Sequence, residues 1–374
     1  MPDTGMNLPK TLAVLRQGVS AGQHLGAQLY VSRPGRVVAD LALGEARAGV
    51  PLRRDTLLPW LSAGKPLTAV AIAQLWEKGA LDLDDRVRRH LPEFAQAGKD
   101  AITLRHLLTH TAGFRGADQI SDALGWEETL AAICATPLEA GWTPGAKAGY
   151  QTHSSWFVLG EIIRRVDGRP LERYARENIF EPLAMVDSWI GMSAETASRY
   201  AARLGALHDT AGGAKPGGTI EPARPGCRPG SGACGPVREL GRFYETLLLG
   251  RTTRIASPHL ILQARTIDAL TARQRTGLFD HTFQHTVDWG LGFLINSNRH
   301  GADTTPYGYG RHCSEDTFGH SGAQSSCAFA DPARQLVVAW VCNGRPGERL
   351  HQHRTRAINT AIYEDLRLAP VQLD

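Results

Sequence analysis

The stretch from Thr68 to Gly79 constrains the fold more than any other part of the chain. Its side chains are apolar nearly all the way round a helix, and it ends in Glu77, Lys78 and Gly79. A helix that is apolar on every side must be buried. A glycine directly after a charged pair is typical of a left-handed helix stop. The sequence therefore predicts a buried helix around which the other elements pack.

Ser62 and Lys65 lie at the start of this predicted helix. With Ser62 as the N-cap, Lys65 takes the third helical position, so hydroxyl and ammonium lie on one face, close together. Pro66 has no N–H and would leave the Ser62 carbonyl unpaired. We therefore expect a distorted first turn or a helix that begins later.

This pair suits a nucleophile and its base. A serine hydroxyl is too weakly acidic to attack a carbonyl group alone, so it needs a base within hydrogen-bond reach. A lysine in a dry site can lose its proton and serve as that base. A backbone N–H at a helix start can also help to hold an oxyanion. The alternative is a serine cap followed by a lysine that reaches solvent, and the four residues alone leave it open.

The segment from Ser62 to Ala69 resembles the first motif of the serine β-lactamase and penicillin-binding-protein superfamily. The similarity is to its class C β-lactamase-like branch, which also holds esterases, D-aminopeptidases and transacylases. Residues 81–85 and 102–114 look like the two segments that follow this motif, and the resemblance extends from about residue 10 to residue 345. It implies a covalent acyl-enzyme on Ser62 with Lys65 as the base.

The resemblance also implies a tyrosine opposite the nucleophile, normally followed two residues later by asparagine. Tyr150 stands at the matching position before a predicted helix. Its phenol would pass the proton between Ser62, the leaving group and the acceptor; a tyrosine that only packs at a helix entrance is the alternative. Thr152 replaces the asparagine, so a hydroxyl stands where an amide would bind substrate. His153 lines the pocket or lies on the surface.

His320 and Gly322 match the histidine-x-glycine form of the third motif, found in the esterase-like members. By resemblance, the N–H of Ala323 would be the second oxyanion donor beside that of Ser62. Gly322 would let substrate approach the backbone closely. His320 would hydrogen-bond Tyr150 and tune it, and a histidine merely satisfied on a strand is the alternative.

The order of predicted elements indicates the fold class. Strands are predicted near both ends of the chain, at 26–32, 36–43, 289–296, 316–330 and 335–342. Helices are predicted at 10–22, 124–135, 154–166, 169–178, 236–249 and 351–366, with helix and loop from Ser62 to about residue 285. This pattern predicts an α/β (α+β) fold, an antiparallel sheet flanked by terminal helices and interrupted by a helical domain. The expected division is 1–57 plus 286–374 for the sheet domain and 58–285 for the helical domain, with the active site at the junction.

Composition excludes several classes of partner. Forty-one basic and thirty-seven acidic residues give a net charge of only +4, which favours neither nucleic acid nor an anionic membrane surface.

The start of the chain shows no secretion signal, so a soluble, cytoplasmic protein is expected. Six widely spaced cysteines indicate free thiols, with a Cys227–Cys234 pair as the alternative. The glycine- and proline-rich tract 211–236 is expected to be a loop over the site.

No metal and no organic cofactor are predicted. His106 and His110 are four residues apart on a predicted helix, but Leu107 occupies the glutamate position of the zinc-protease motif and no third ligand is apparent. The sequence also has no phosphate loop and no dinucleotide fingerprint.

The predicted function is serine-dependent acyl transfer from a small-molecule ester. The resemblance implies either hydrolysis by water or transfer to an amine or alcohol, as in the antibiotic-pathway transacylases of the capuramycin type, which exchange an ester for an amide. Thr152 and the third motif favour this side of the family over a β-lactamase or D-amino peptidase, which stay as alternatives. A non-catalytic, ligand-binding member of the fold is the alternative of another class. The acyl donor, the acceptor and the oligomeric state are not predicted.

Overall fold

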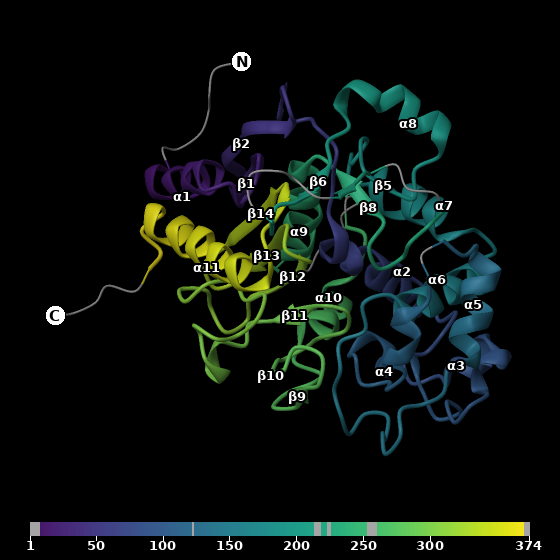
Figure 1. Cartoon of the computed structure of the whole chain (residues 1–374). Helices are drawn as coiled ribbons and strands as arrows, with labels where there is room; N and C mark the ends of the chain where they lie inside the picture. Colours follow the sequence, from purple (N-terminus) through teal and green to yellow (C-terminus); the bar gives the residue numbers. More distant parts are fainter. Residues whose placement is uncertain (1–7, 122, 213–217, 223–225, 253–259, 370–374) are drawn as a thin grey trace.

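A seven-stranded antiparallel sheet forms one half of the protein (Figure 1). The computed structural model describes residues 8–121, 123–212, 218–222, 226–252 and 260–369. The sheet has the order β11-β12-β13-β14-β1-β2-β3. Its strands are β1 (Gly26–Arg33), β2 (Arg36–Arg47), β3 (Val50–Pro51), β11 (Leu294–Ile295), β12 (Phe318–Gly322), β13 (Ser326–Asp331) and β14 (Leu336–Cys342). Strands from the two ends of the chain therefore meet at the β1–β14 pair, as the sequence predicted.

Helices cover both faces of this sheet. Along β1, Leu29 packs in the cluster that contains Ile358 of α11, whereas its neighbour Tyr30 packs in the cluster that contains Leu240 of α9. Successive strand residues point to opposite faces. One face is thus covered by α1 (Pro9–Ser20) and α11 (Glu348–Asp365), which pack side by side, and the other by α9 (Val237–Thr252). The expected sheet with flanking terminal helices is confirmed.

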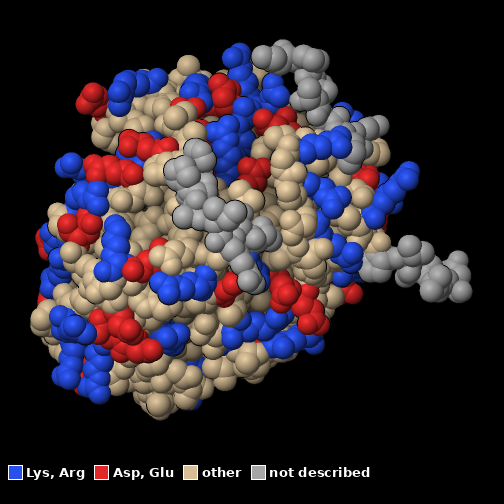
Figure 2. Space-filling view, turned by 180° about the vertical axis from the view of Figure 1, so that it is seen from behind, with Lys and Arg blue, Asp and Glu red and all other residues tan. Residues whose placement is uncertain are grey.

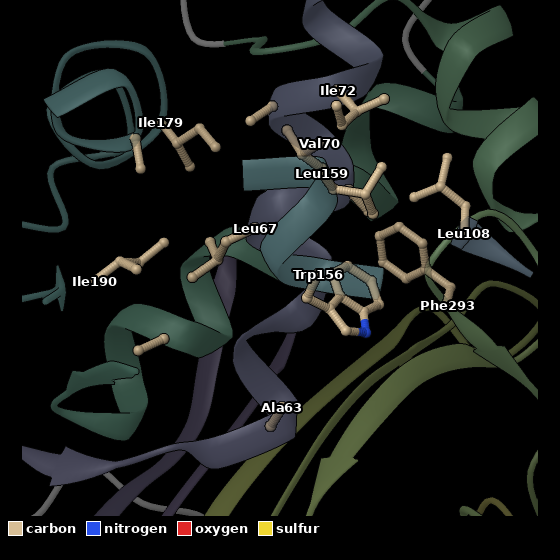
Figure 3. Packing of buried hydrophobic residues seen from close by; sticks show 14 of the residues in the cluster. Ala63, Leu67, Val70, Ile72, Leu108, Trp156, Leu159, Ile179, Ile190 and Phe293 are labelled. Atoms are coloured by element: carbon tan, nitrogen blue, oxygen red, sulfur yellow. The ribbon is translucent and has the colours of Figure 1, made fainter. Parts of the chain in front are cut away.

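Helix α2 (Lys65–Glu77) is the centre of the other half. Every residue from Lys65 to Leu75 is buried, and Gly79 follows the helix with a φ of +68°. Figure 3 shows Leu67 and Val70 of α2 packed near Leu159 of α6. The predicted buried helix with a left-handed glycine stop is confirmed. Helix α2 packs against α6 (Ser154–Asp167), α7 (Leu171–Ala175) and α10 (Ala264–Thr271). The remaining α-helices among the described residues of 58–293, apart from α9, are α3 (Val87–His90), α4 (Leu104–Leu108), α5 (Trp126–Ala135) and α8 (Ala194–Tyr200).

The start of α2 differs from the simplest expectation. Ser62 lies in a 3-10 turn, η1 (Leu61–Gly64), and α2 begins only at Lys65. Ser62 is therefore not the N-cap, and the later start expected from Pro66 is confirmed. Leu61 has a φ of +50°, a strained value for a residue with a side chain. Ser62 thus follows a sharp local change of chain direction.

Short strands interrupt the region predicted to be only helix and loop. They are β4 (Leu58–Pro59), β5 (Trp189–Ile190), β6 (Leu207–Asp209), β7 (Thr219–Ile220), β8 (Ala233–Gly235), β9 (Phe279–Asp280) and β10 (His285–Thr286), and β15 (Gly344–Arg345) joins β6. Two or three residues cannot show an alternating pattern, so no sequence signal predicts these strands. The strand expected at 289–296 shrinks to β11, and 316–330 is two strands. The helix expected at 169–178 is α7 followed by a π-helical turn (Arg176–Phe180). The division into two domains stays a prediction.

Two further expectations have clear outcomes. All six cysteines are free, so Cys227 and Cys234 do not pair. His106 lies in α4, but that helix ends at Leu108 and His110 has a φ of +56°, so the two histidines do not share a helix face.

In the part of the chain that the structure describes, no helix is long and apolar enough to cross a bilayer. Both charge signs are interspersed over the face seen in Figure 2, in keeping with the small net charge.

Candidate active site

The Lys65 ammonium group joins three segments of the chain. Its Nζ lies 2.9 Å from Ser62 Oγ, 2.8 Å from the Thr152 carbonyl oxygen and 2.8 Å from the Gly230 carbonyl oxygen. Lys65 is fully buried, whereas Ser62 is half-buried. The predicted pair is thus within hydrogen-bond distance. Of the 211–236 tract, 213–217 and 223–225 lie outside the described residues, and its later part supplies Gly230.

Burial changes the proton affinity of this amine. It lowers the pKa of Lys65 from 10.5 to about 7, and the charge of Asp118 partly opposes that shift. Desolvation disfavours a charged amine, whereas a nearby carboxylate favours it. A substantial fraction of Lys65 is therefore the neutral amine near neutral pH, which a general base requires.

Tyr150 reaches the same place from the segment before α6. Its ring centroid lies 5.4 Å from Lys65 Nζ, and the ring centroid of Trp156 lies 5.5 Å from the same atom. Burial raises the pKa of Tyr150 well above its usual range, and a hydrogen bond with Ser62 opposes this shift. Tyr150 is therefore a neutral phenol at neutral pH. The Ser62 hydroxyl, the Lys65 amine and the Tyr150 phenol, predicted from two distant motifs, meet in one site.

Strand β12 packs directly against the turn that carries Ser62. A Cβ atom added to Gly322 would lie 2.4 Å from the Trp60 carbonyl oxygen and 2.3 Å from Ser326 Oγ. Ser326 Oγ donates to that same carbonyl at 2.7 Å. Glycine is therefore required for the contact between strand and turn, and its role towards substrate stays a prediction. Ala323 is exposed just beyond the end of β12.

His320 lies beside Tyr150 without the expected hydrogen bond. Its Nδ1 is 2.9 Å from the Ser321 carbonyl oxygen, so Nδ1 carries the hydrogen and Nε2 the lone pair. That Nε2 is buried and has no hydrogen-bond partner among the described residues. The ring centroids of His320 and Tyr150 are 6.1 Å apart. Burial and the charge of Lys65 lower the pKa of His320 to about 3, so the ring is neutral.

Thr152 meets Lys65 through its main chain, and His153 lines an adjoining cavity. Thr152 contacts Lys65 through its main-chain carbonyl, which any residue would offer. His153 is half-buried and lines a cavity of about 510 Å³. Gly230 and Ser154 also line this cavity, so it adjoins the Lys65 site. The rest of its lining is mainly apolar and includes Ile120, Leu124, Trp126, Ile133 and Phe157.

Sequence reasoning missed two contributors to this site. Gly230 provides only a carbonyl oxygen, so no side chain could have signalled its position. Asp118 lies in a short 3-10 turn, η3 (Arg115–Gln119), where a single aspartate carries no motif. In the described residues, no group of three or more histidine, cysteine, aspartate or glutamate side chains is arranged to hold a metal ion.

Comparison with known proteins agrees with this geometry. The Beta-lactamase family matches residues 12–362, so the chain belongs to that family. A penicillin-binding-protein homologue from Caulobacter crescentus has a solved structure similar to this one, with a TM-score of 0.78 and 30% sequence identity over 96% of this chain and 97% of that one. The resemblance read from the motifs is confirmed.

Two curated relatives are similar over part of their length. Esterase EstB of Burkholderia gladioli is 34% identical over 197 residues, which cover 47% of this chain and 49% of EstB. Monacolin J acid methylbutanoyltransferase of Aspergillus terreus is 33% identical over 167 residues, 37% of this chain and 38% of that one. Each match spans less than half of the relative. Family and relatives place the chain among enzymes of the serine hydrolase and acyltransferase type.

Proposed function

We propose that this protein cleaves small-molecule esters through a covalent acyl-enzyme on Ser62, then passes the acyl group to water, an amine or an alcohol. The observation that carries the proposal is the 2.9 Å contact between Ser62 Oγ and the fully buried Lys65 ammonium. An esterase and an acyltransferase among the relatives support it. Ester-to-amide exchange in natural-product biosynthesis is the transfer form of this proposal.

In the acylation step, neutral Lys65 takes the hydroxyl proton of Ser62 while Oγ bonds to the ester carbonyl carbon. The carbonyl π electrons move onto oxygen, and the backbone N–H groups of Ser62 and Ala323 are the proposed donors to this oxyanion. When the C=O bond re-forms, the ester C–O bond breaks. The leaving alkoxide takes a proton from the Tyr150 phenol, which Lys65 then reprotonates.

In the second step, an acceptor replaces Ser62. Water, an amine or an alcohol gives a proton to neutral Lys65 and bonds to the acyl carbon. Collapse of this intermediate expels Ser62 Oγ, which takes a proton back through Lys65 or Tyr150. The product is a free acid, an amide or a new ester, and the enzyme returns to its starting state.

The cavity beside the site points to the kind of ester. Trp126, Phe157 and Leu124 line it together with other apolar side chains, and its volume is about 510 Å³. Apolar pockets of this size bind apolar groups through the area removed from water. We therefore propose an ester with an aromatic or branched aliphatic group. A β-lactam or peptide amide is less suited, because position 152 offers Lys65 a main-chain carbonyl and has no side-chain amide.

Covalent labelling tests the proposed nucleophile. A serine-reactive fluorophosphonate should add one phosphonyl group per chain, with the modified peptide containing Ser62, and Ser62→Ala should abolish it. Ser198→Ala is the matched control, because Ser198 is exposed and its hydroxyl only contacts the Ala194 carbonyl oxygen. If the protein is not labelled and turns over no ester in a broad panel, the ligand-binding alternative is supported instead.

The acceptor is identified by product analysis. A chromogenic aryl ester is supplied with and without a primary amine, and the products are separated by mass spectrometry. An amide that forms faster with enzyme than without it indicates transfer. Free acid alone under both conditions would remove the acyltransferase form and leave the hydrolase.

A further inference from the structure

Five consecutive backbone N–H groups, from Tyr150 to Ser154, are each held by a side chain from elsewhere. Tyr150 N donates to Asp280 Oδ1 at 3.0 Å. Gln151 N donates to His110 Nδ1 at 3.1 Å. Asp118 accepts from the other three. The segment that carries Tyr150 is thus fixed residue by residue, although it belongs to neither a helix nor a strand until Ser154.

Asp118 makes the largest share of these contacts. Its Oδ2 accepts from Thr152 N at 2.6 Å, and its Oδ1 accepts from His153 N at 3.1 Å and Ser154 N at 2.8 Å. The Ser154 hydroxyl donates to the same Oδ1 at 2.8 Å. A carboxylate has about four acceptor sites. Both oxygens of Asp118 therefore accept from this one segment.

The geometry explains why a carboxylate stands here. Helix α6 begins at Ser154, and the first N–H groups of a helix have no partner within it. Asp118 lies 36 residues earlier and takes the capping role that a neighbouring side chain commonly plays. Its negative charge is also favoured by the helix dipole. The contact fixes Ser154 and, two residues before it, the Thr152 carbonyl that accepts from Lys65.

We propose that Asp118 is a positioning residue for acylation: it fixes the Tyr150–Ser154 segment against Lys65 and places a negative charge near that amine. The inference rests on the proposed function, in which Lys65 is the base. Asp118 acts through Lys65 and Tyr150.

Asp118 is the charged partner that matters for Lys65. The other titratable groups around Lys65 are Tyr150, His110 and His320. Burial raises the pKa of Tyr150 and lowers the pKa of both histidines, so all three are neutral near neutral pH. Arg115, on which the charge of Asp118 acts, pairs with Glu139, and Asp280, whose charge acts on Tyr150 as that of Asp118 does, pairs with Arg275. The charge of Asp118 raises the pKa of Lys65 against the effect of burial.

The test compares Asp118→Asn with Glu239→Gln. Glu239 also accepts from a distant backbone N–H, that of Asp187 at 3.1 Å, and from a serine hydroxyl, that of Ser188 at 2.6 Å, but it holds a different segment. The measurement is the rate constant of fluorophosphonate labelling as a function of pH, with thermal unfolding alongside. Should Asp118→Asn fold poorly, Asp118→Ser carries the same test, because serine is also a good cap and has no charge.

For Asp118→Asn we expect labelling at least about tenfold slower. We also expect the fall of the labelling rate constant on the acid side of its pH profile to move to lower pH, because the carboxylate that raises the pKa of Lys65 is gone. Glu239→Gln should be less stable than wild type but should keep the wild-type pH profile of labelling. A wild-type rate and limb in Asp118→Asn would overturn the positioning role. A wild-type protein that is not labelled at Ser62 would overturn the proposed function itself, so the two failures are distinguishable.

Discussion

Lys65 and Lys99 are buried lysines with nearly the same kind of surroundings. Each ammonium donates to three oxygen atoms and lies within 5.5 Å of an aromatic ring centroid. For Lys99 the acceptors are the carbonyls of Gln96, Cys134 and Thr136, and the ring is Phe94. Burial lowers the pKa of both amines.

The difference lies in what the acceptors can do. All three acceptors of Lys99 are carbonyls, and two of them, from Cys134 and Thr136, lie at the end of α5. A carbonyl has no proton to give, so Lys99 caps a helix end. One acceptor of Lys65 is the Ser62 hydroxyl, which has a proton to transfer. Burial alone therefore does not make a lysine a catalytic base; the partner decides it.

The largest expected difference is in catalytic activity when each lysine is replaced. Lys65→Met removes the proposed base, and we expect kcat/KM for an ester to fall by about 10³-fold or more. Lys99→Met should stay within about threefold of wild type, because no proton passes through Lys99. Steady-state kinetics on both variants measures this. Similar losses in the two would break the comparison.

The second prediction concerns the stability that Lys99 contributes. Lys99→Met removes the ammonium donor from three carbonyls, of which that of Cys134 is buried, so we expect the free energy of unfolding to fall by about 1–3 kcal/mol in urea titrations. Lys147→Met is the control, because Lys147 is exposed and donates to one carbonyl, that of Gly141. It should change the free energy by less than about 0.5 kcal/mol. An equally small loss for Lys99→Met would contradict a capping role.

The third prediction concerns the aromatic ring beside each lysine. Tyr150→Phe gives Lys65 the kind of ring that Lys99 already has in Phe94, and removes the phenol that is the proposed proton donor to the leaving group. We expect kcat to fall by about 10²-fold with little change in KM. Tyr200→Phe, which loses a hydroxyl bound to Asp187, is the control and should keep its activity. Full activity in Tyr150→Phe would remove the phenol from the proton path.

The smallest effect is a pH dependence. Only neutral Lys65 can act as the base, so kcat/KM should fall about tenfold per pH unit below a pKa of about 7. In the unfolded chain Lys65 keeps its ordinary pKa of 10.5, so unfolding takes up a proton between these values. The free energy of unfolding should therefore rise with pH from about 7 to 10.5, and Lys65→Met should flatten that slope. A Lys65→Met protein with the wild-type slope would contradict the lowered pKa.

The comparison also shows what could be read from the sequence. The apolar helix after Lys65, the terminal strands and the Ser62–Lys65 spacing are local patterns, and each was found in the expected place. Short strands such as β8 and the turn at Leu61 were missed, because tertiary contacts and strain create them. Asp118 was missed because a lone aspartate in a loop has no pattern.

The sequence by itself determined the family, the buried helix and the spacing of the Ser62–Lys65 pair, since these depend on residue types at fixed spacings along the chain. Only the tertiary structure decided which buried lysine faces a hydroxyl, which carbonyls complete its shell and which carboxylates hold the Tyr150 segment. The physical reason is distance along the chain. Lys65 and Gly230 are 165 residues apart, and no local pattern records which oxygen a buried amine will meet.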